Sequence, residues 1–189
     1  MIGPREVLRK GDGVLVVHVQ VDFCPGGALP APEGDKVVPV LNRWIEAAQE
    51  LGIPVYASRD WHPQRHGSFK EEGGEWPPHC LQDSEGARFH PDLRLPPNVV
   101  KVTSGVRFDF DQYSAFKETG FATLLRKDKV KRLWLGGLVL EYCVMESALG
   151  AREEGFEASV IKDATRSLTM EGEKEAIRKL RAAGVEIVD

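Results

Sequence analysis

A cysteine that follows a pair of glycines is the first residue whose setting could support chemistry. The segment 133–143 reads LWLGGLVLEYC, so Cys143 comes shortly after an apolar run and Gly136-Gly137. If a strand ends at the glycines and a helix follows, backbone N–H groups and the positive end of the helix dipole lie beside the thiol. That setting favours a thiolate. The alternative is a small buried residue that packs at the turn, which is the more common place for a free cysteine.

A second group of reactive side chains comes after the segment 53–58. Asp60 and His62 are two residues apart, so in an extended chain their side chains point the same way. His66 follows four residues after His62, and His79 lies in the sequence WPPHC. One carboxylate with imidazoles suits Zn²⁺, Mn²⁺ or Fe²⁺ better than Ca²⁺ or Mg²⁺. The alternative is a set of unrelated loop residues, and it stays open at this point.

Two aromatic residues, Phe23 and Trp76, flank this region of the sequence. Most aromatic side chains pack in a core. Beside a metal, two ring faces could instead hold a flat aromatic ligand between them.

The elements that must position these residues follow from hydrophobic periodicity. Apolar, β-branched runs predict six strands, and helical spacing predicts the helices between them. The predicted strands are 14–21, 53–58, 98–103, 130–136, 157–164 and 185–189, and the predicted helices are 37–51, 121–128, 141–155 and 171–184. The long segment 59–97 has no periodicity yet holds four of the chain's five histidines, which is typical of a functional loop.

Alternation of strands and helices predicts an α/β fold, a three-layer, doubly wound, mainly parallel sheet in a single domain, 1–189. Ligands of such sheets bind beyond the carboxyl ends of the strands. Polar or reactive residues lie at or just past the ends of the first four predicted strands. They are His18, Asp22, Asp60, His62, Ser104 and Cys143. We therefore expect one shared site at this edge.

Composition narrows the class of function. The net charge is −4 and the pI is near 5.8, which argues against nucleic-acid partners and binding to an anionic membrane. No apolar run approaches the ~20 residues that span a bilayer, and the N-terminus lacks the apolar core of a secretory signal. Three cysteines are too few for a disulfide framework, so we expect a cytoplasmic protein.

Seven motifs together resemble a known family. They are VDF at 21–23, SRDWHP at 58–63, HGSF at 66–69, WPPHC at 76–80, FHPDL at 89–93, YSAF at 113–116 and GGLVLEYCV at 136–144. In this order they are similar to the nicotinamidase/pyrazinamidase branch of the isochorismatase-like cysteine hydrolases. The resemblance implies a six-stranded sheet of order 3-2-1-4-5-6, hydrolysis of nicotinamide to nicotinate and ammonia, and a bound divalent metal, most often zinc.

The resemblance also implies roles for individual residues. Asp60, His62 and His79 match the family's metal ligands, and His66 matches a frequent companion. Cys143 matches the nucleophile. Residues expected at the substrate are Phe23, Trp76, Tyr113, Leu138 and Val139, and the Leu138–Val139 peptide bond falls where the family has a cis bond. The partner is then a small heterocyclic amide, and the oligomeric state is left open.

Two positions depart from the family's Asp–Lys–Cys triad. The strand reads VHVQVDF, so His18 stands at the place of the aspartate, and counting back from YSAF puts Ser104 at the place of the lysine. Replacing both avoids a buried unpaired charge. Either His18 serves as the base for Cys143, as in other histidine–cysteine pairs, or the pocket binds without turnover. A family hydrolase of another small substrate is the third possibility.

Overall fold

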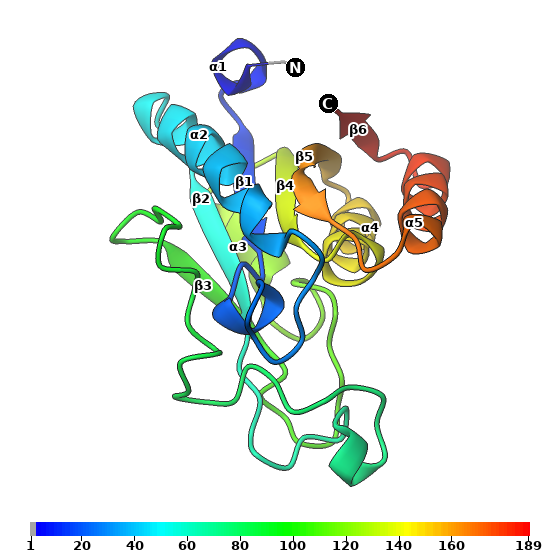
Figure 1. The fold of residues 1–189 in the computed structure, drawn as a ribbon. Helices are drawn as coiled ribbons and strands as arrows, with labels where there is room; N and C mark the ends of the chain where they lie inside the picture. Colours follow the sequence, from blue (N-terminus) through cyan, green and yellow to red (C-terminus); the bar gives the residue numbers. More distant parts are fainter. Residues whose placement is uncertain (1–2) are drawn as a thin grey trace.

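The computed structural model describes residues 3–189 and contains one parallel sheet with helices on both faces (Figure 1). The strands are β1 Asp12–Val17, β2 Val55–Asp60, β3 Val100–Ser104, β4 Arg132–Leu138, β5 Glu157–Arg166 and β6 Glu186–Val188. Their order is β3-β2-β1-β4-β5-β6, and every neighbouring pair is parallel. The predicted fold class and strand order are confirmed.

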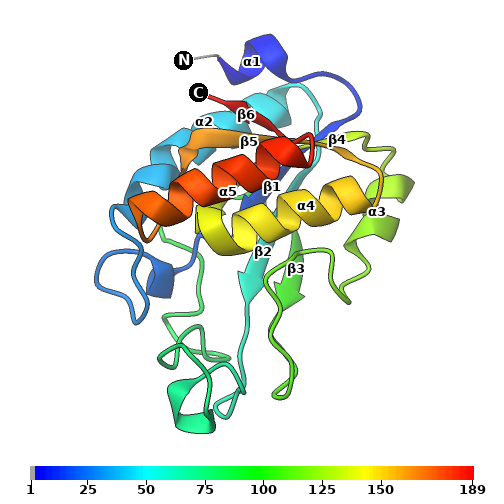
Figure 2. The same ribbon diagram turned by 90° about the vertical axis from the view of Figure 1, so that its right-hand side faces the viewer.

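Helices form the two outer layers. The α-helices are α1 Pro4–Val7, α2 Val37–Glu50, α3 Phe121–Lys127, α4 Met145–Glu153 and α5 Met170–Ala182, and the short helical turns are η1 Val21–Phe23, η2 Gly34–Lys36, η3 Lys70–Glu72 and η4 Leu140–Val144. Figure 2 shows α4 and α5 running side by side over one face of the sheet, with α2 behind the sheet. None of the helices in residues 3–189 combines the length and apolarity that crossing a bilayer requires.

Strand β1 joins the two halves of the core. All six of its residues are buried, as expected of a central strand covered on both faces. Because successive side chains alternate between faces, Val14 and Val16 pack in the cluster around α2, whereas Leu15 and Val17 pack with α3, α4 and α5. The central position of β1 puts its carboxyl end between those of β2 and β4.

Several predicted boundaries were wrong. The strand predicted over 14–21 ends at Val17, because His18 has a left-handed backbone with φ of 45°. Strand β2 extends to Asp60, two residues past its predicted end. The helix predicted over 141–155 begins as the π-helical turn η4, and α1 was not predicted. Apart from α1, these differences concern only the ends of elements. The strands and helices that position the site were predicted.

Candidate active site

Cys143 lies in η4, directly after β4, where it is 7% exposed. The Leu138–Val139 peptide bond between strand and turn is cis, as the resemblance implied. Gly137 precedes it with φ of 137°, and a Cβ on this residue would overlap the Val17 carbonyl oxygen of the neighbouring strand. Only glycine fits this close approach, which sets the path of the chain into the turn that carries the thiol.

Asp60, His62 and His79 converge on one point. One potential ligand atom of each lies within 4.8 Å of the others, and all three residues are buried. The Nδ1 atom of His62 is 3.0 Å from the Gly105 carbonyl oxygen, and that of His79 is 2.8 Å from the Pro77 carbonyl oxygen. Such contacts orient histidine ligands and leave Nε2 for a metal. The donor set of two imidazoles and one carboxylate fits a divalent transition metal.

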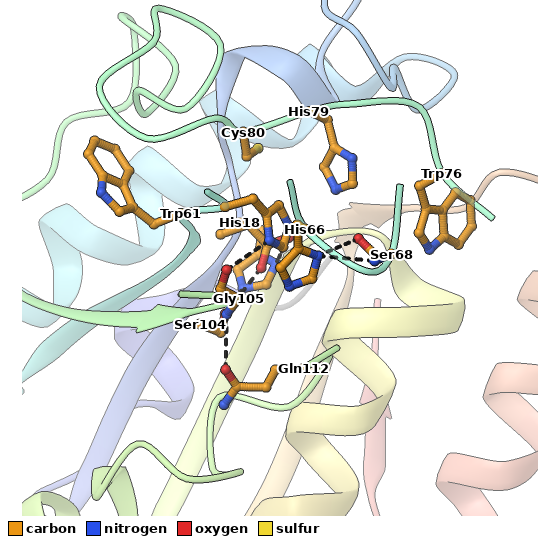
Figure 3. A network of polar contacts seen from close by, with 12 residues as sticks. His18, Trp61, His66, Ser68, Trp76, His79, Cys80, Ser104, Gly105 and Gln112 are labelled. Atoms are coloured by element: carbon orange, nitrogen blue, oxygen red, sulfur yellow. Dashed lines mark hydrogen bonds and ion pairs between the residues drawn. The ribbon is translucent and has the colours of Figure 1, made fainter. Parts of the chain in front are cut away.

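His66 lies beside this group without joining it. Its ring centroid is 4.2 Å from that of His62. Its Nδ1 atom is 2.7 Å from Ser68 Oγ, as Figure 3 shows, and its Nε2 atom is 3.2 Å from the Phe110 carbonyl oxygen. Both ring nitrogens therefore already have polar neighbours, and direct ligation by His66 stays a prediction.

His18 and Ser104 meet at Asp60, and each is 1% exposed. The Ser104 hydroxyl lies 3.1 Å from Asp60 Oδ1, to which it can donate, and 3.5 Å from His18 Nε2. His18 Nδ1 lies 3.5 Å from Asp60 Oδ2. A ring nitrogen of His18 also lies within 4.8 Å of the sulfur of Cys143. The structure thus brings together the three residues predicted to carry the catalysis.

Burial controls the charge of these groups. Desolvation lowers the pKa of His18, although the Asp60 carboxylate opposes this change. Desolvation and then Asp60 raise the pKa of the Cys143 thiol well above its ordinary value. Burial opposes ionisation of Asp60, but His18 and His62 hold its pKa below the usual range. The resting site therefore pairs a neutral imidazole with a protonated thiol, and such a thiol needs a base before it can attack.

A pocket of about 480 Å³, including the space open to solvent, is lined both by Cys143 and by Asp60, His62 and His79. Its wall contains nine of the predicted site residues. The lining residues are Phe23, Leu29, Asp60, His62, Trp76, His79, Asp111, Gln112, Tyr113, Leu138, Val139, Tyr142, Cys143 and Leu168. Trp76 Nε1 donates to Tyr113 Oη at 2.9 Å, which fixes two of the aromatic rings. His18 and Ser104 lie outside this wall.

Comparison with known proteins identifies the family. The family model described as Isochorismatase domain matches residues 12–189. The chain belongs to the isochorismatase family. It is 37% identical over 194 residues to a nicotinamidase of Escherichia coli (strain K12), covering 90% of this chain and 91% of that protein. These similarities support the nicotinamidase branch.

Solved structures agree with this assignment. A pyrazinamidase of Pyrococcus horikoshii in complex with zinc has a TM-score of 0.92 and 41% identity, and the match covers 95% of this chain and 99% of that one. PnC1 of L. infantum in complex with nicotinate has a TM-score of 0.89 and 32% identity, with 94% and 92% coverage. This isochorismatase-family chain therefore has the fold of proteins that were solved with zinc and with nicotinate.

The sequence did not identify two buried amides as site residues. Gln20, which is fully buried, accepts from the Asp60 backbone N–H and donates to the Asp60 carbonyl oxygen, both at 2.8 Å. Gln112 accepts from the Gly105 N–H at 3.0 Å (Figure 3), and Gly105 in turn contacts His62. For Gln20 there was a signal, because an amide in an apolar run needs buried partners. No pattern marked Gln112, which lies in an aperiodic loop.

The remaining polar and thiol groups near the pocket have structural contacts. Asp22 accepts from the backbone N–H groups of Ala28 and Cys80, so it joins two loops. Cys24 is buried, which raises the pKa of its thiol to about 11. Burial also raises the pKa of Cys80. Both thiols are therefore neutral near pH 7.

Proposed function

We propose that this protein is a metal-containing cysteine amidohydrolase that converts nicotinamide to nicotinate and ammonia through an acyl-thioester on Cys143. One observation carries the proposal: Cys143, the Asp60–His62–His79 group and the aromatic side chains share a single pocket. The similarity to the Escherichia coli nicotinamidase, at 37% identity, supports an amide as the substrate.

The pocket suits a flat heterocyclic amide. Phe23 and Trp76 offer ring faces, and Leu138 with Val139 adds apolar wall beside the thiol. Asp60, His62 and His79 would hold the divalent ion, and zinc fits these nitrogen and oxygen donors. A bound divalent ion supplies a Lewis-acid contact for a heteroatom of the substrate.

His18 is the proposed base. It takes the thiol proton as Cys143 Sγ attacks the amide carbon, and it returns that proton to the nitrogen that leaves as ammonia. Water then gives a proton to His18 as it attacks the thioester, which releases nicotinate and restores the thiol. Proton transfer needs hydrogen-bond distance between the His18 nitrogen and the Cys143 sulfur, which lie within 4.8 Å of each other. Contacts of this kind are commonly long before substrate binds.

Ser104 is the proposed positioning residue for this base. Its hydroxyl lies between Asp60 Oδ1 and His18 Nε2, at 3.1 and 3.5 Å. The hydroxyl restrains the imidazole without adding the charge that a lysine would bring.

Burial, which raises the pKa of the Cys143 thiol, favours a second candidate function, binding of the amide without turnover. Measuring ammonia and nicotinate after incubation of the zinc-loaded protein with nicotinamide separates the two. Amidase function predicts release that Cys143→Ala abolishes, with Cys24→Ala as the matched thiol control. Equal release from wild type and Cys143→Ala would reject the proposal. Carbamoyl and vinyl-ether substrates in the same assay test another hydrolase specificity.

Two further proposals concern the cellular location of the protein and its domain organisation. All three cysteines are free and buried, in line with a cytoplasmic location. We also propose that the whole chain, 1–189, forms one catalytic domain, because the family match and the sheet both extend through its C-terminal residues.

A further inference from the structure

A second group of potential metal ligands lies next to the first and includes the nucleophile. One ligand atom each from His18, Asp60 and Cys143 lies within 4.8 Å of the others, and all three residues are buried. We propose that these side chains form a second metal position for a thiophilic divalent ion such as Zn²⁺. Both positions would share the Asp60 carboxylate.

The open nitrogen of His18 is the independent observation behind this proposal. His18 Nδ1 is fully buried and has no hydrogen-bond partner among residues 3–189, although Asp60 Oδ2 is 3.5 Å away. Buried polar atoms without partners are rare and call for an ion or a water molecule. The left-handed backbone of His18, with φ of 45°, costs energy for a residue with a side chain. Among the residues that the structure describes, His18 therefore presents a buried imidazole nitrogen without a hydrogen bond beside the Asp60 carboxylate.

The donor chemistry of the group suits zinc. Imidazole nitrogen, carboxylate oxygen and thiolate sulfur are all zinc ligands, and sulfur selects against Mg²⁺ and Ca²⁺. When the ion binds, the Cys143 proton leaves to solvent, and the thiolate adds one negative charge to that of the shared Asp60 carboxylate.

The surrounding charges favour a cation at this position. The described residues that line the pocket include no lysine or arginine, whereas Asp111 lies in the same wall as Asp60. Ser104, which contacts both Asp60 and His18, is uncharged. The carboxylates of Asp60 and Asp111 would therefore offset part of the charge of a cation beside Cys143.

Metal binding at the second position should inhibit the enzyme. This expectation rests on the proposed function. A metal held by Cys143 and His18 withdraws the nucleophile and its base together. Zinc is then expected to raise the activity of metal-free protein while it fills the Asp60–His62–His79 position, and to lower it at higher concentration.

Cobalt binding tests the second position without any assay of turnover. Metal-free, full-length protein is titrated with Co²⁺ while the near-ultraviolet thiolate-to-cobalt charge-transfer band is recorded. We expect two ions per chain and a band that Cys143→Ser and His18→Ala remove, leaving one ion. His79→Ala should lose one ion and keep the band, and Cys24→Ser should change neither. Circular dichroism checks the fold, and His18→Asn replaces His18→Ala if that variant unfolds.

Other outcomes overturn the proposal. A wild-type protein without the band at excess Co²⁺ has no second position at Cys143. A band that persists in Cys143→Ser, or at full strength in a folded His18 variant, shows that other side chains bind the metal. An active amidase without the band at excess Co²⁺ would reject the second position alone. A protein that shows the band at excess Co²⁺ but stays inactive with one equivalent of zinc, which fills only the first position, would reject the proposed function alone.

Discussion

At the scale of single residues, the Asp60 carboxylate connects the proposed metal ligands His62 and His79 with the proposed base His18. His62 Nε2 and His18 Nδ1 approach the same oxygen, Oδ2, at 3.7 and 3.5 Å, and Ser104 contacts Oδ1. Any charge introduced at position 18 or 104 therefore acts directly on Asp60. His18 and Ser104 add no carboxylate to this contact with Asp60.

This arrangement predicts strong coupling between substitutions at 18 and 104. In metal-free protein, His18→Asp puts a second buried carboxylate beside Asp60 and should lower the free energy of unfolding by about 3 kcal/mol. Adding Ser104→Lys supplies a cation, so the double variant should be more stable than the sum of the singles by about 1–3 kcal/mol. Urea unfolding of the four proteins measures the coupling. Additive effects would show that the two positions do not interact.

Predictability differed among the site residues. Asp60, His62 and Cys143 could be proposed because they lie at or just past strand ends, where a parallel sheet collects ligands. His79 lies in the long loop between β2 and β3, and only the WPPHC motif indicated it. His66 has the same residue type and a similar place in the sequence, yet its ring faces Ser68 and the Phe110 carbonyl. The direction of a side chain in a loop depends on backbone conformation that periodicity does not encode.

At the scale of secondary structure elements, the passage from β4 into η4 decides where the thiol lies. Gly137 makes this passage possible because a Cβ would overlap the Val17 carbonyl oxygen of β1. The strand, the glycines and the cysteine were predictable from LWLGGLVLEYC. The π-helical form of Leu140–Val144 was not, because one extra residue per turn leaves no clear mark in a five-residue pattern.

Gly137→Ala should therefore destabilise the protein by about 3 kcal/mol or more, since both the φ of 137° and the contact with β1 oppose a side chain. Gly155→Ala is the matched control: its φ of 87° is also positive, but nothing lies within 4 Å of the position that a Cβ would take there. That variant should lose only about 1 kcal/mol. Thermal and urea unfolding compare the two. Equal losses would contradict the importance of the contact with Val17.

The ends of β1 and β2 show the same limit of sequence analysis. Apolar residues continue to Val21, so periodicity extends the strand past Val17. The actual end depends on the left-handed backbone at His18 and on Gln20, whose side chain contacts the backbone of Asp60. The contact of Gln20 with Asp60 joins two segments that are far apart in the sequence, so the pattern of a single strand cannot predict it.

At the scale of the whole molecule, metal binding should stabilise the fold, because its proposed ligands come from β2 and from the long loop after it. Zinc at about 100 times its dissociation constant should add about 2.7 kcal/mol to the free energy of unfolding. Chelation should reverse the gain. His79→Ala should be insensitive to most of this zinc effect, whereas His90→Ala, which alters a histidine outside the site, should respond as wild type. Calorimetry checks this, and an unchanged melting temperature in wild type would argue against a metal at this site.

The central claim is that Cys143 works with His18 in place of an aspartate and a lysine. The most direct test compares kcat/KM for nicotinamide between wild type and His18→Ala, with the zinc content of each protein measured in parallel. We predict that His18→Ala lowers kcat/KM by about 10²–10⁴-fold while zinc at the Asp60–His62–His79 position is retained. A folded, zinc-containing His18→Ala variant that hydrolyses nicotinamide as fast as wild type would contradict this account.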